Sequence, residues 1–209
     1  MGRFWGKILD FGFLGPWSLL FKVLDAIFPN NPRLTVFGSN HGLHFSDNSK
    51  ALFIHFIEEM ETTKPIWITR SKDVFKEIES EYPGHVVMSF SLRGVYTFLR
   101  ASQIVISHSY LDMCLFPYTR SKTVNYLWHG VPIRRIGRMI EQGESEATDR
   151  MLLHWSRWNG VVDYFFASSE YEARIMKKAF RLGGMKCEIT GYPRNDVLHI
   201  EMEKAEIGN

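Results

Sequence analysis

The stretch YLWHGVPIRRIG, residues 126–137, decides the fold class and the place of a candidate site. Thr123–Trp128 is a short apolar and aromatic run, which predicts a buried strand. Gly130 permits a close backbone turn, and Pro132 has the preset φ of a first helical position. His129 therefore lies between a predicted strand and a predicted cationic helix. An imidazole at such a junction is well placed for chemistry on phosphates.

The residues that follow His129 predict a pocket for anions. The N–H groups of a helix start lack partners within the helix, and Arg134 and Arg135 add positive charge beside them. Gly130 would let a phosphate approach the backbone closely. Taken alone, His129 has a second interpretation, a packed histidine at the end of a strand. The motifs elsewhere in the chain favour the site.

Apolar runs alternate with helical patterns along most of the chain. The runs predict strands at Leu34–Gly38, Ile66–Thr69, Val86–Ser89, Ile104–Ser107, Thr123–Trp128, Asp163–Ser168 and Glu188–Thr190. The patterns between them predict helices at Ser49–Glu61, Lys72–Glu81, Leu92–Ala101, Arg134–Ile140, Ser169–Phe180 and Asp196–Glu203. This alternation predicts an α/β fold, a Rossmann-like parallel sheet with helices on both faces. Right-handed crossovers would place the loops that follow the strands along one edge.

The first 28 residues are the most apolar part of the chain. Asp10, Gly12, Gly15 and Pro16 interrupt the only span long enough to cross a bilayer, and there is no cleavage site typical of a signal peptide. Two short amphipathic helices broken at Gly15-Pro16 suit the plane of a membrane surface. The alternative is a pair of helices packed on a sheet. We therefore divide the chain into a membrane-associating segment, 1–30, and a Rossmann-like domain, 31–209.

Composition excludes several classes of function. The net charge of +2 is too small to indicate binding to nucleic acid. The two cysteines, Cys114 and Cys187, lack metal-ligand spacing and do not indicate a disulfide framework. We find neither a P-loop nor an acidic cluster spaced for metal ligands. The long irregular stretch 141–160 is of a length that is usually functional or mobile.

Three motifs together carry a family resemblance. They are FSDNSKALF at 45–53, WHGVPIRRIG at 128–137 and GYPRNDVL at 191–198. In this order and approximate spacing, over residues 34 to 199, the chain resembles the CDP-glycerol glycerophosphotransferases, which prime or polymerise the glycerol phosphate chains of teichoic acids. The resemblance implies a two-domain glycosyltransferase-B-like fold whose second half holds CDP-glycerol. This chain matches only the first, acceptor-side half, so the nucleotide-binding C-terminal domain is expected to be absent.

The resemblance also implies roles for particular residues. His129 would be the catalytic base that activates an acceptor hydroxyl for attack on CDP-glycerol. A phosphate-binding set would comprise Gly130, Arg134, Arg135 and Arg194. An acceptor-binding set would comprise Ser46, Asp47, Asn48, Ser49 and Lys50, although these residues also suit a simple helix cap. No resident cofactor or metal site is implied. CDP-glycerol is the donor substrate, and Mg²⁺ on its nucleotide is compatible with the resemblance.

Other polar residues keep two interpretations. His41 and His44 have a spacing that suggests a metal pair, but without nearby carboxylates or thiolates we interpret them as loop or acceptor-contacting histidines. Ser107-His108-Ser109-Tyr110 is either a polar contact at the active edge or a helix cap, and we favour the cap. Arg194 belongs either to a phosphate contact or hinge, or to a structural turn.

The expected partners are a lipid-linked polyol-phosphate acceptor, the membrane surface, and the missing nucleotide-binding domain in cis or in trans. The expected location is peripheral, on the cytoplasmic face of the cell membrane. Two alternatives remain open. One is a noncatalytic module that binds anionic lipid or polymer at the membrane surface. The other is a different glycosyltransferase-B enzyme that uses CDP-ribitol or a nucleotide sugar.

Overall fold

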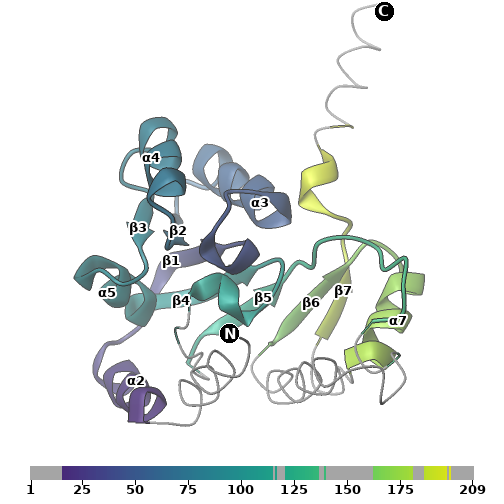
Figure 1. The fold of residues 1–209 in the computed structure, drawn as a ribbon, viewed down its shortest axis with the longest axis horizontal. Helices are drawn as coiled ribbons and strands as arrows, with labels where there is room; N and C mark the ends of the chain where they lie inside the picture. Colours follow the sequence, from purple (N-terminus) through teal and green to yellow (C-terminus); the bar gives the residue numbers. More distant parts are fainter. Residues whose placement is uncertain are drawn as a thin grey trace, which may run out of the picture.

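Seven parallel strands form one hydrogen-bonded sheet in the described part of the chain, in the order β3-β2-β1-β4-β5-β6-β7 (Figure 1). The structure is a computed structural model of the 209-residue chain, and it describes residues 16–114, 116, 121–136, 139, 162–180, 186–196 and 198. The strands are β1 (Asn31–Gly38), β2 (Lys64–Thr69), β3 (Val86–Met88), β4 (Ala101–Ile106), β5 (Thr123–Tyr126), β6 (Tyr164–Ala167) and β7 (Lys186–Ile189). The first six follow the doubly wound order, with its switch point between β1 and β4. All seven predicted strands are confirmed.

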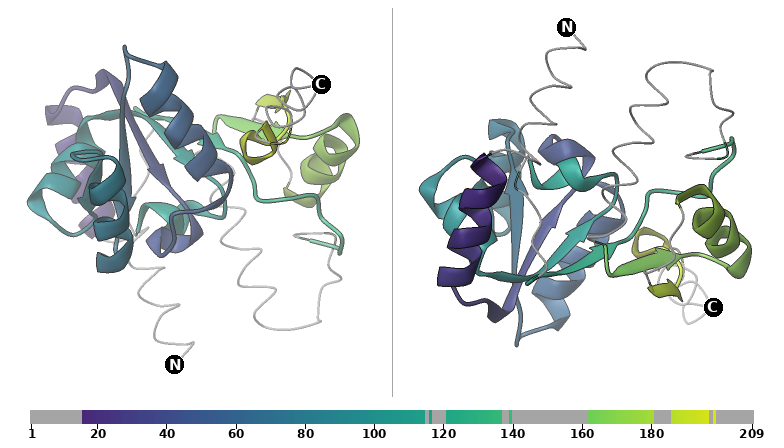
Figure 2. Two further views of the ribbon diagram at one scale, coloured as in Figure 1. Left: turned by 90° about the horizontal axis from the view of Figure 1, so that it is seen from above. Right: turned by 90° about the horizontal axis from the view of Figure 1, so that it is seen from below.

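Helices cover both faces of this sheet (Figure 2). They are α2 (Pro16–Ile27), α3 (Asp47–Glu59), α4 (Lys72–Glu81), α5 (Leu92–Arg100) and α7 (Glu170–Phe180), with short 3₁₀ turns η1 (Asn40–Gly42), η2 (Tyr110–Met113) and η4 (Pro193–Asn195). Helices α3 and α4 pack on one face, and α2, α5 and α7 pack on the other. The predicted Rossmann-like α/β fold is confirmed.

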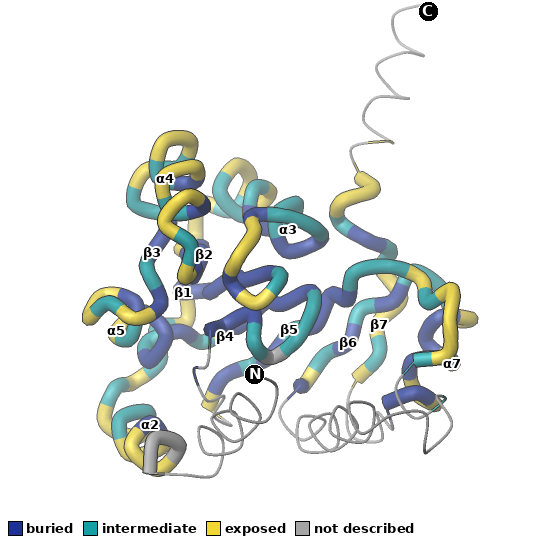
Figure 3. Tube along the Cα trace, in the orientation of Figure 1, coloured by how far each residue is buried: buried dark blue, intermediate teal, exposed yellow. Residues whose placement is uncertain are grey.

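The alternation of side chains along each strand divides the core in two. Val36 and Ile104 point to the face with α2, α5 and α7, whereas Phe37 and Val105 point to the face with α3 and α4. Burial on both faces explains why the inner parts of β1, β2 and β4 are continuously buried and largely apolar. Figure 3 shows these central strands buried, whereas the edge strand β7 is mostly exposed.

Helix α2 is attached to the domain by a buried ion pair as well as by apolar packing. Phe21 is buried against the rings of Phe98 and Phe116. The ammonium of Lys122 lies 2.8 Å from a carboxylate oxygen of Asp25, and the two side chains are 0% and 8% exposed. The helix is therefore part of the folded domain, while residues 1–15 lie outside the described residues.

One predicted helix, Arg134–Ile140, does not form at Arg134–Ile136. Val131–Ile136 forms bends and coil, Met139 lies in a 3₁₀ turn, and Gly137, Arg138 and Ile140 lie outside the described residues. No Ser, Thr, Asp or Asn precedes Pro132 to cap a helix, and a residue before proline is driven out of the helical region. No helix therefore starts at Pro132. The anion-binding role of Arg134 and Arg135 stays a prediction.

Two other predictions fall largely outside the described residues. The irregular stretch 141–160 is not described. Of the predicted helix Asp196–Glu203, only Asp196 and Leu198 are described, and both are helical.

Candidate functional site

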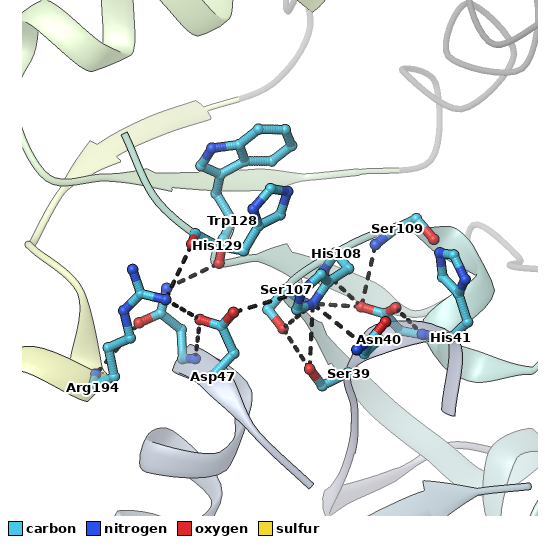
Figure 4. A network of polar contacts seen from close by, with 12 residues as sticks. Ser39, Asn40, His41, Asp47, Ser107, His108, Ser109, Trp128, His129 and Arg194 are labelled. Carbon is cyan, nitrogen blue, oxygen red and sulfur yellow. Dashed lines mark hydrogen bonds and ion pairs between the residues drawn. The ribbon is translucent and has the colours of Figure 1, made fainter. Parts of the chain in front are cut away.

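The carboxyl ends of β1, β4 and β5 bring a polar cluster together beside the switch point (Figure 4). Strand β4 pairs with β5 so that Ile106 lies opposite Tyr126, which places His108 and His129 in neighbouring loops. Their rings stack with centroids 4.8 Å apart and an interplanar angle of 13°. On its other side His129 stacks on the indole of Trp128, at 4.1 Å and 28°. His129 thus lies between two aromatic planes.

The residues on both sides of His129 have positive φ angles. Trp128 has φ 60°, and Gly130 has φ 147°. The left-handed region is costly for a bulky residue such as tryptophan. This conformation ends β5 at Tyr126, two residues before the predicted end, and turns His129 out of the sheet. Strain of this kind is common where a fold has to aim a functional side chain.

Asp47 and Arg194 connect the cluster to the C-terminal part of the described chain. The guanidinium of Arg194 donates to the carboxylate of Asp47 at 2.7 Å and to the carbonyl of His129 at 3.1 Å. The other carboxylate oxygen of Asp47 lies 3.6 Å from Nε2 of His108. A Cβ at Gly130 would lie 3.4 Å from the Arg194 guanidinium, an ordinary contact, so it is the φ of 147° that favours glycine here.

The buried side chain of Asn48 joins the same segments by hydrogen bonds. Its side-chain amide donates to the carbonyl of Trp128 at 2.9 Å and accepts from the backbone N–H of Arg194 at 3.3 Å. Asn48 and Ser49 are both 0% exposed. Lys50 is partly exposed, with its ammonium 4.5 Å above the ring of Phe45. Ser46 occupies the N-cap position of α3, but its side chain makes no capping hydrogen bond.

The structure therefore divides the predicted site residues. His129, Gly130, Asp47, Asn48 and Arg194 come together in one cluster. Arg134 and Arg135 are exposed on the segment that follows. The acceptor-binding role of residues 46–50 stays a prediction, with Ser46, Asp47 and Lys50 the members that reach the surface.

A second group of residues was not selected from the sequence. Nδ1 of His108 accepts the N–H of Asn40 at 3.3 Å and lies 3.3 Å from Oγ of Ser39 and 3.2 Å from Oγ of Ser107. The sequence analysis favoured a cap for residues 107–110, and Ser109 does cap η2 in a capping box. His108 has a separate position, in the site. The sequence held one signal for this position. His108 follows a predicted strand, as His129 does, and neighbouring parallel strands bring such positions to one edge of the sheet.

The buried carboxylate of Asp112 organises both loops. It accepts the backbone N–H groups of His41 at 2.9 Å, Ser107 at 3.1 Å, His108 at 2.8 Å and Ser109 at 3.2 Å. These bonds join the loop after β1 to the loop after β4. Burial raises the pKa of Asp112, and the N–H groups of His41, His108 and Ser109 act against that rise.

The pKa of His129 lies below its ordinary value of 6.5. Burial is the largest cause, the charges of His108 and Arg194 lower it further, and the carboxylate of Asp47 raises it. A lowered pKa keeps the imidazole neutral near pH 7, the form that accepts a proton. The site is therefore suited to general-base chemistry next to cationic groups.

The model of the family described as CDP-Glycerol:Poly(glycerophosphate) glycerophosphotransferase matches residues 20–208. The chain belongs to this family. The resemblance inferred from the three motifs is confirmed.

Named relatives support the assignment. The teichoic acid glycerol-phosphate transferase of Staphylococcus aureus is 29% identical over 197 residues, which cover 90% of this chain and 47% of the relative. The teichoic acid poly(glycerol phosphate) polymerase of Bacillus spizizenii is 26% identical over 201 residues, covering 91% and 48%. The chain thus spans about half the length of these curated relatives.

Solved structures support the fold. A structure of the wall teichoic acid polymerase TagF aligns with a TM-score of 0.71 at 23% identity, covering 86% of this chain and 43% of TagF. A second TagF structure aligns with a TM-score of 0.68 at 22% identity, covering 85% and 42%. At this identity the likeness establishes the parallel α/β architecture.

Proposed function

We propose that this chain is the acceptor-side half of a glycerophosphotransferase that moves glycerol phosphate from CDP-glycerol to a polyol-phosphate acceptor in teichoic acid synthesis. The observation that carries the proposal is the position of His129. It is held at the carboxyl edge of the sheet, neutral near pH 7 and next to Arg194. Family membership supplies the substrates, because the family is described by CDP-glycerol and poly(glycerophosphate).

In the proposed reaction, the acceptor hydroxyl attacks the β-phosphorus of CDP-glycerol while its proton passes to His129. A new P–O bond forms to the acceptor, the bond between the β-phosphorus and the bridging oxygen breaks, and CMP leaves with the electron pair. A neutral imidazole is a suitable base for a weakly acidic hydroxyl. The developing charge on the phosphoryl oxygens requires fixed cations, for which Arg194, Arg134 and Arg135 are the candidates.

We infer that the acceptor approaches from the side of α3. Ser46 is the N-cap residue of that helix, and Lys50 on its first turn adds a positive charge to the surface of the site. A glycerol phosphate end carries negative charge, which the lysine and the helix N-terminus would both favour. Lys50→Met should therefore raise KM for the acceptor more than it lowers kcat.

The donor would be held by a nucleotide-binding half that this chain does not match. Within the described residues no group of three or more His, Cys, Asp or Glu side chains is arranged to hold a metal ion. We propose separately that any Mg²⁺ accompanies the diphosphate of the donor. Arg194, which ties the C-terminal part of the described chain to Asp47 and His129, is the proposed phosphate contact or hinge anchor between the halves.

The deciding experiment measures CMP release from CDP-glycerol with a lipid-linked glycerol phosphate acceptor in vesicles. It uses both this chain and a longer form that carries the nucleotide-binding half. We expect release from the longer form and its loss in His129→Asn, with exposed His55→Asn on α3 as the matched control. Full activity of His129→Asn would refute the proposed base. Turnover with CDP-ribitol or a nucleotide sugar instead of CDP-glycerol would reassign the donor.

We also propose that the protein works peripherally on the cytoplasmic face of the membrane. None of the described helices is long and apolar enough to cross a bilayer. Helix α2 exposes large apolar side chains beside exposed Lys22, namely Leu19 at 65%, Leu20 at 47%, Val23 at 50% and Ile27 at 63%. Such a surface suits the interface between headgroups and acyl chains.

Substitution is a better test of this location than deletion, because Phe21 and Asp25 of α2 are buried in the domain. The double variant Leu19→Ser/Ile27→Ser should lower cosedimentation with anionic vesicles. Leu198→Ser, a change at another exposed leucine, is the control. Equal cosedimentation of the two variants would contradict the membrane role of α2.

A further inference from the structure

His108 is held rigidly by protein groups at both ring nitrogens. Nδ1 faces the N–H of Asn40 at 3.3 Å and the hydroxyls of Ser39 and Ser107, and Nε2 faces the carboxylate of Asp47 at 3.6 Å. A backbone N–H only donates, so Nδ1 is an acceptor and the ring proton of the neutral form resides on Nε2. This assigns the tautomer of His108, with its N–H directed at Asp47.

His129 is held in a different way. Within the described residues no hydrogen bond reaches either of its ring nitrogens, and only its backbone carbonyl is engaged, by Arg194. A catalytic histidine is commonly oriented by a carboxylate that accepts from one ring nitrogen. Here the orientation comes from stacking, between Trp128 at 4.1 Å and His108 at 4.8 Å (Figure 4). Among the residues that the structure describes, both nitrogens of His129 are thus left open to a substrate.

We propose that His108 is a positioning residue that fixes the ring plane of His129 by stacking, while Asp47, Ser39 and Ser107 fix His108. The proposal rests on the proposed role of His129 as the base. It accounts together for the ring contact, for the polar partners at both ring nitrogens of His108 and for the absence of such partners at the ring nitrogens of His129 among the described residues. The ring of His108 acts through His129 and need not touch substrate.

Electrostatics adds a second consequence of the same arrangement. Burial is the largest cause of the lowered pKa of His129; a protonated His108 and the guanidinium of Arg194 lower it further, and the carboxylate of Asp47 raises it. His41 and the buried carboxyl of Asp112 face His108 from the neighbouring loops. Removing the ring of His108 should therefore free the ring of His129 and raise its pKa.

The first test needs no turnover. The ring protons of His129 are followed by NMR in the 209-residue chain for wild type, His108→Ala and His108→Phe. Protons above an aromatic plane are shielded, so His108→Ala should shift the His129 signals downfield and raise the pKa of His129. His108→Phe keeps a flat ring and should retain the shielding. Exposed His44→Ala is the control.

The second test uses the longer form that carries the nucleotide-binding half. Misplacing a catalytic group by about 1 Å costs roughly 10²-fold in rate, so His108→Ala should lower kcat by about that factor. KM for the acceptor should stay within about threefold on the same argument. His108→Phe should recover most of kcat.

The outcomes separate this inference from the proposed function. Loss of activity in His129→Asn, with unchanged shielding and unchanged kcat in His108→Ala, would overturn the positioning role alone. Full activity of His129→Asn would refute the proposed base, and the NMR comparison would still decide whether His108 holds the ring. If circular dichroism shows that His108→Ala is misfolded, His108→Phe becomes the deciding variant. Retained shielding of the His129 protons then supports the positioning role, and lost shielding overturns it.

Discussion

The carboxylate of Asp112 shows how one residue assembles this site. It is 0% exposed and accepts four backbone N–H groups, three from the loop after β4 and one from His41 in the loop after β1. Neither loop has a regular ladder that would satisfy these donors. Asp112 therefore fixes the backbone that carries His108.

Replacing Asp112 tests this at the residue scale. Asparagine keeps the size but replaces one acceptor oxygen by an N–H₂ group, which would face backbone donors. We expect Asp112→Asn to lower the free energy of unfolding by about 3 kcal/mol, because buried donors lose their partners. Exposed Asp73→Asn on α4 should change it by less than about 0.5 kcal/mol. Urea denaturation compares the two, and equal effects would refute the role of Asp112.

Gly38 provides another single-residue test. A Cβ there would lie 2.5 Å from the carbonyl oxygen of Asp112 and 2.6 Å from the methyl group of Met113. The backbone of η2 would have to move, and overpacking of this kind costs about 1–3 kcal/mol. Gly38→Ala should lower the midpoint of urea unfolding and disturb the His108 signals in NMR. An unchanged midpoint would show that η2 is free to shift.

At the scale of elements, the attachment of α2 is decided by the pairing of Asp25 with Lys122. The ammonium of Lys122 also donates to the carbonyls of Leu99 at 2.8 Å and Ala101 at 3.1 Å, where α5 meets β4. Burial lowers the pKa of Lys122, and Asp25 raises it. One lysine thus joins α2, α5 and the amino edge of the sheet.

Breaking this pair should be more harmful than removing it. Lys122→Met removes the ammonium from the buried carboxylate of Asp25, which should lower the free energy of unfolding by about 3–5 kcal/mol. The double variant Asp25→Asn/Lys122→Met should recover part of that loss. Lys22→Met, at an exposed lysine on α2, is the control. A loss no larger than the control's, measured in urea, would show that the apolar packing of Phe21 holds the helix by itself.

At the scale of the whole molecule, two apolar layers meet across one sheet, and the site lies at an edge where polar groups become buried. Because His129 has a lowered pKa, the folded state takes up a proton on this residue less readily than the unfolded state does. Below the unfolded value of 6.5 the unfolded chain binds more protons. Stability from this residue is therefore complete above 6.5 and is lost as pH falls through the folded pKa.

This sign gives a measurable pH dependence. The free energy of unfolding should decrease as pH falls below about 6.5, before the carboxylates titrate. His129→Asn should flatten the decrease in that window while leaving the values above pH 7.5 parallel to wild type. Urea titrations from pH 5.5 to 8 provide the comparison. A wild-type slope that persists in His129→Asn would assign the effect to another group.

Local sequence patterns predicted most elements of the fold, but not all of them. The central strands follow from runs such as Leu34–Gly38 and Ile104–Ser107, because burial on both faces demands mainly apolar residues. The helix expected over Arg134–Ile140 does not form at Arg134–Ile136, because Pro132 is compatible with irregular backbone as well as with a helix start. Local preference leaves such cases open.

The sequence by itself determined the α/β class and the family, and it selected His129 as the candidate base. It could do so because apolar periodicity and local motifs are properties of neighbouring residues. Only the tertiary structure decided that His108 stacks on His129, that Asp112 joins two loops, and that Arg194 reaches Asp47 across 147 positions. These contacts join residues far apart along the chain. They depend on the order of the parallel strands, which brings separate strand ends to one edge of the sheet.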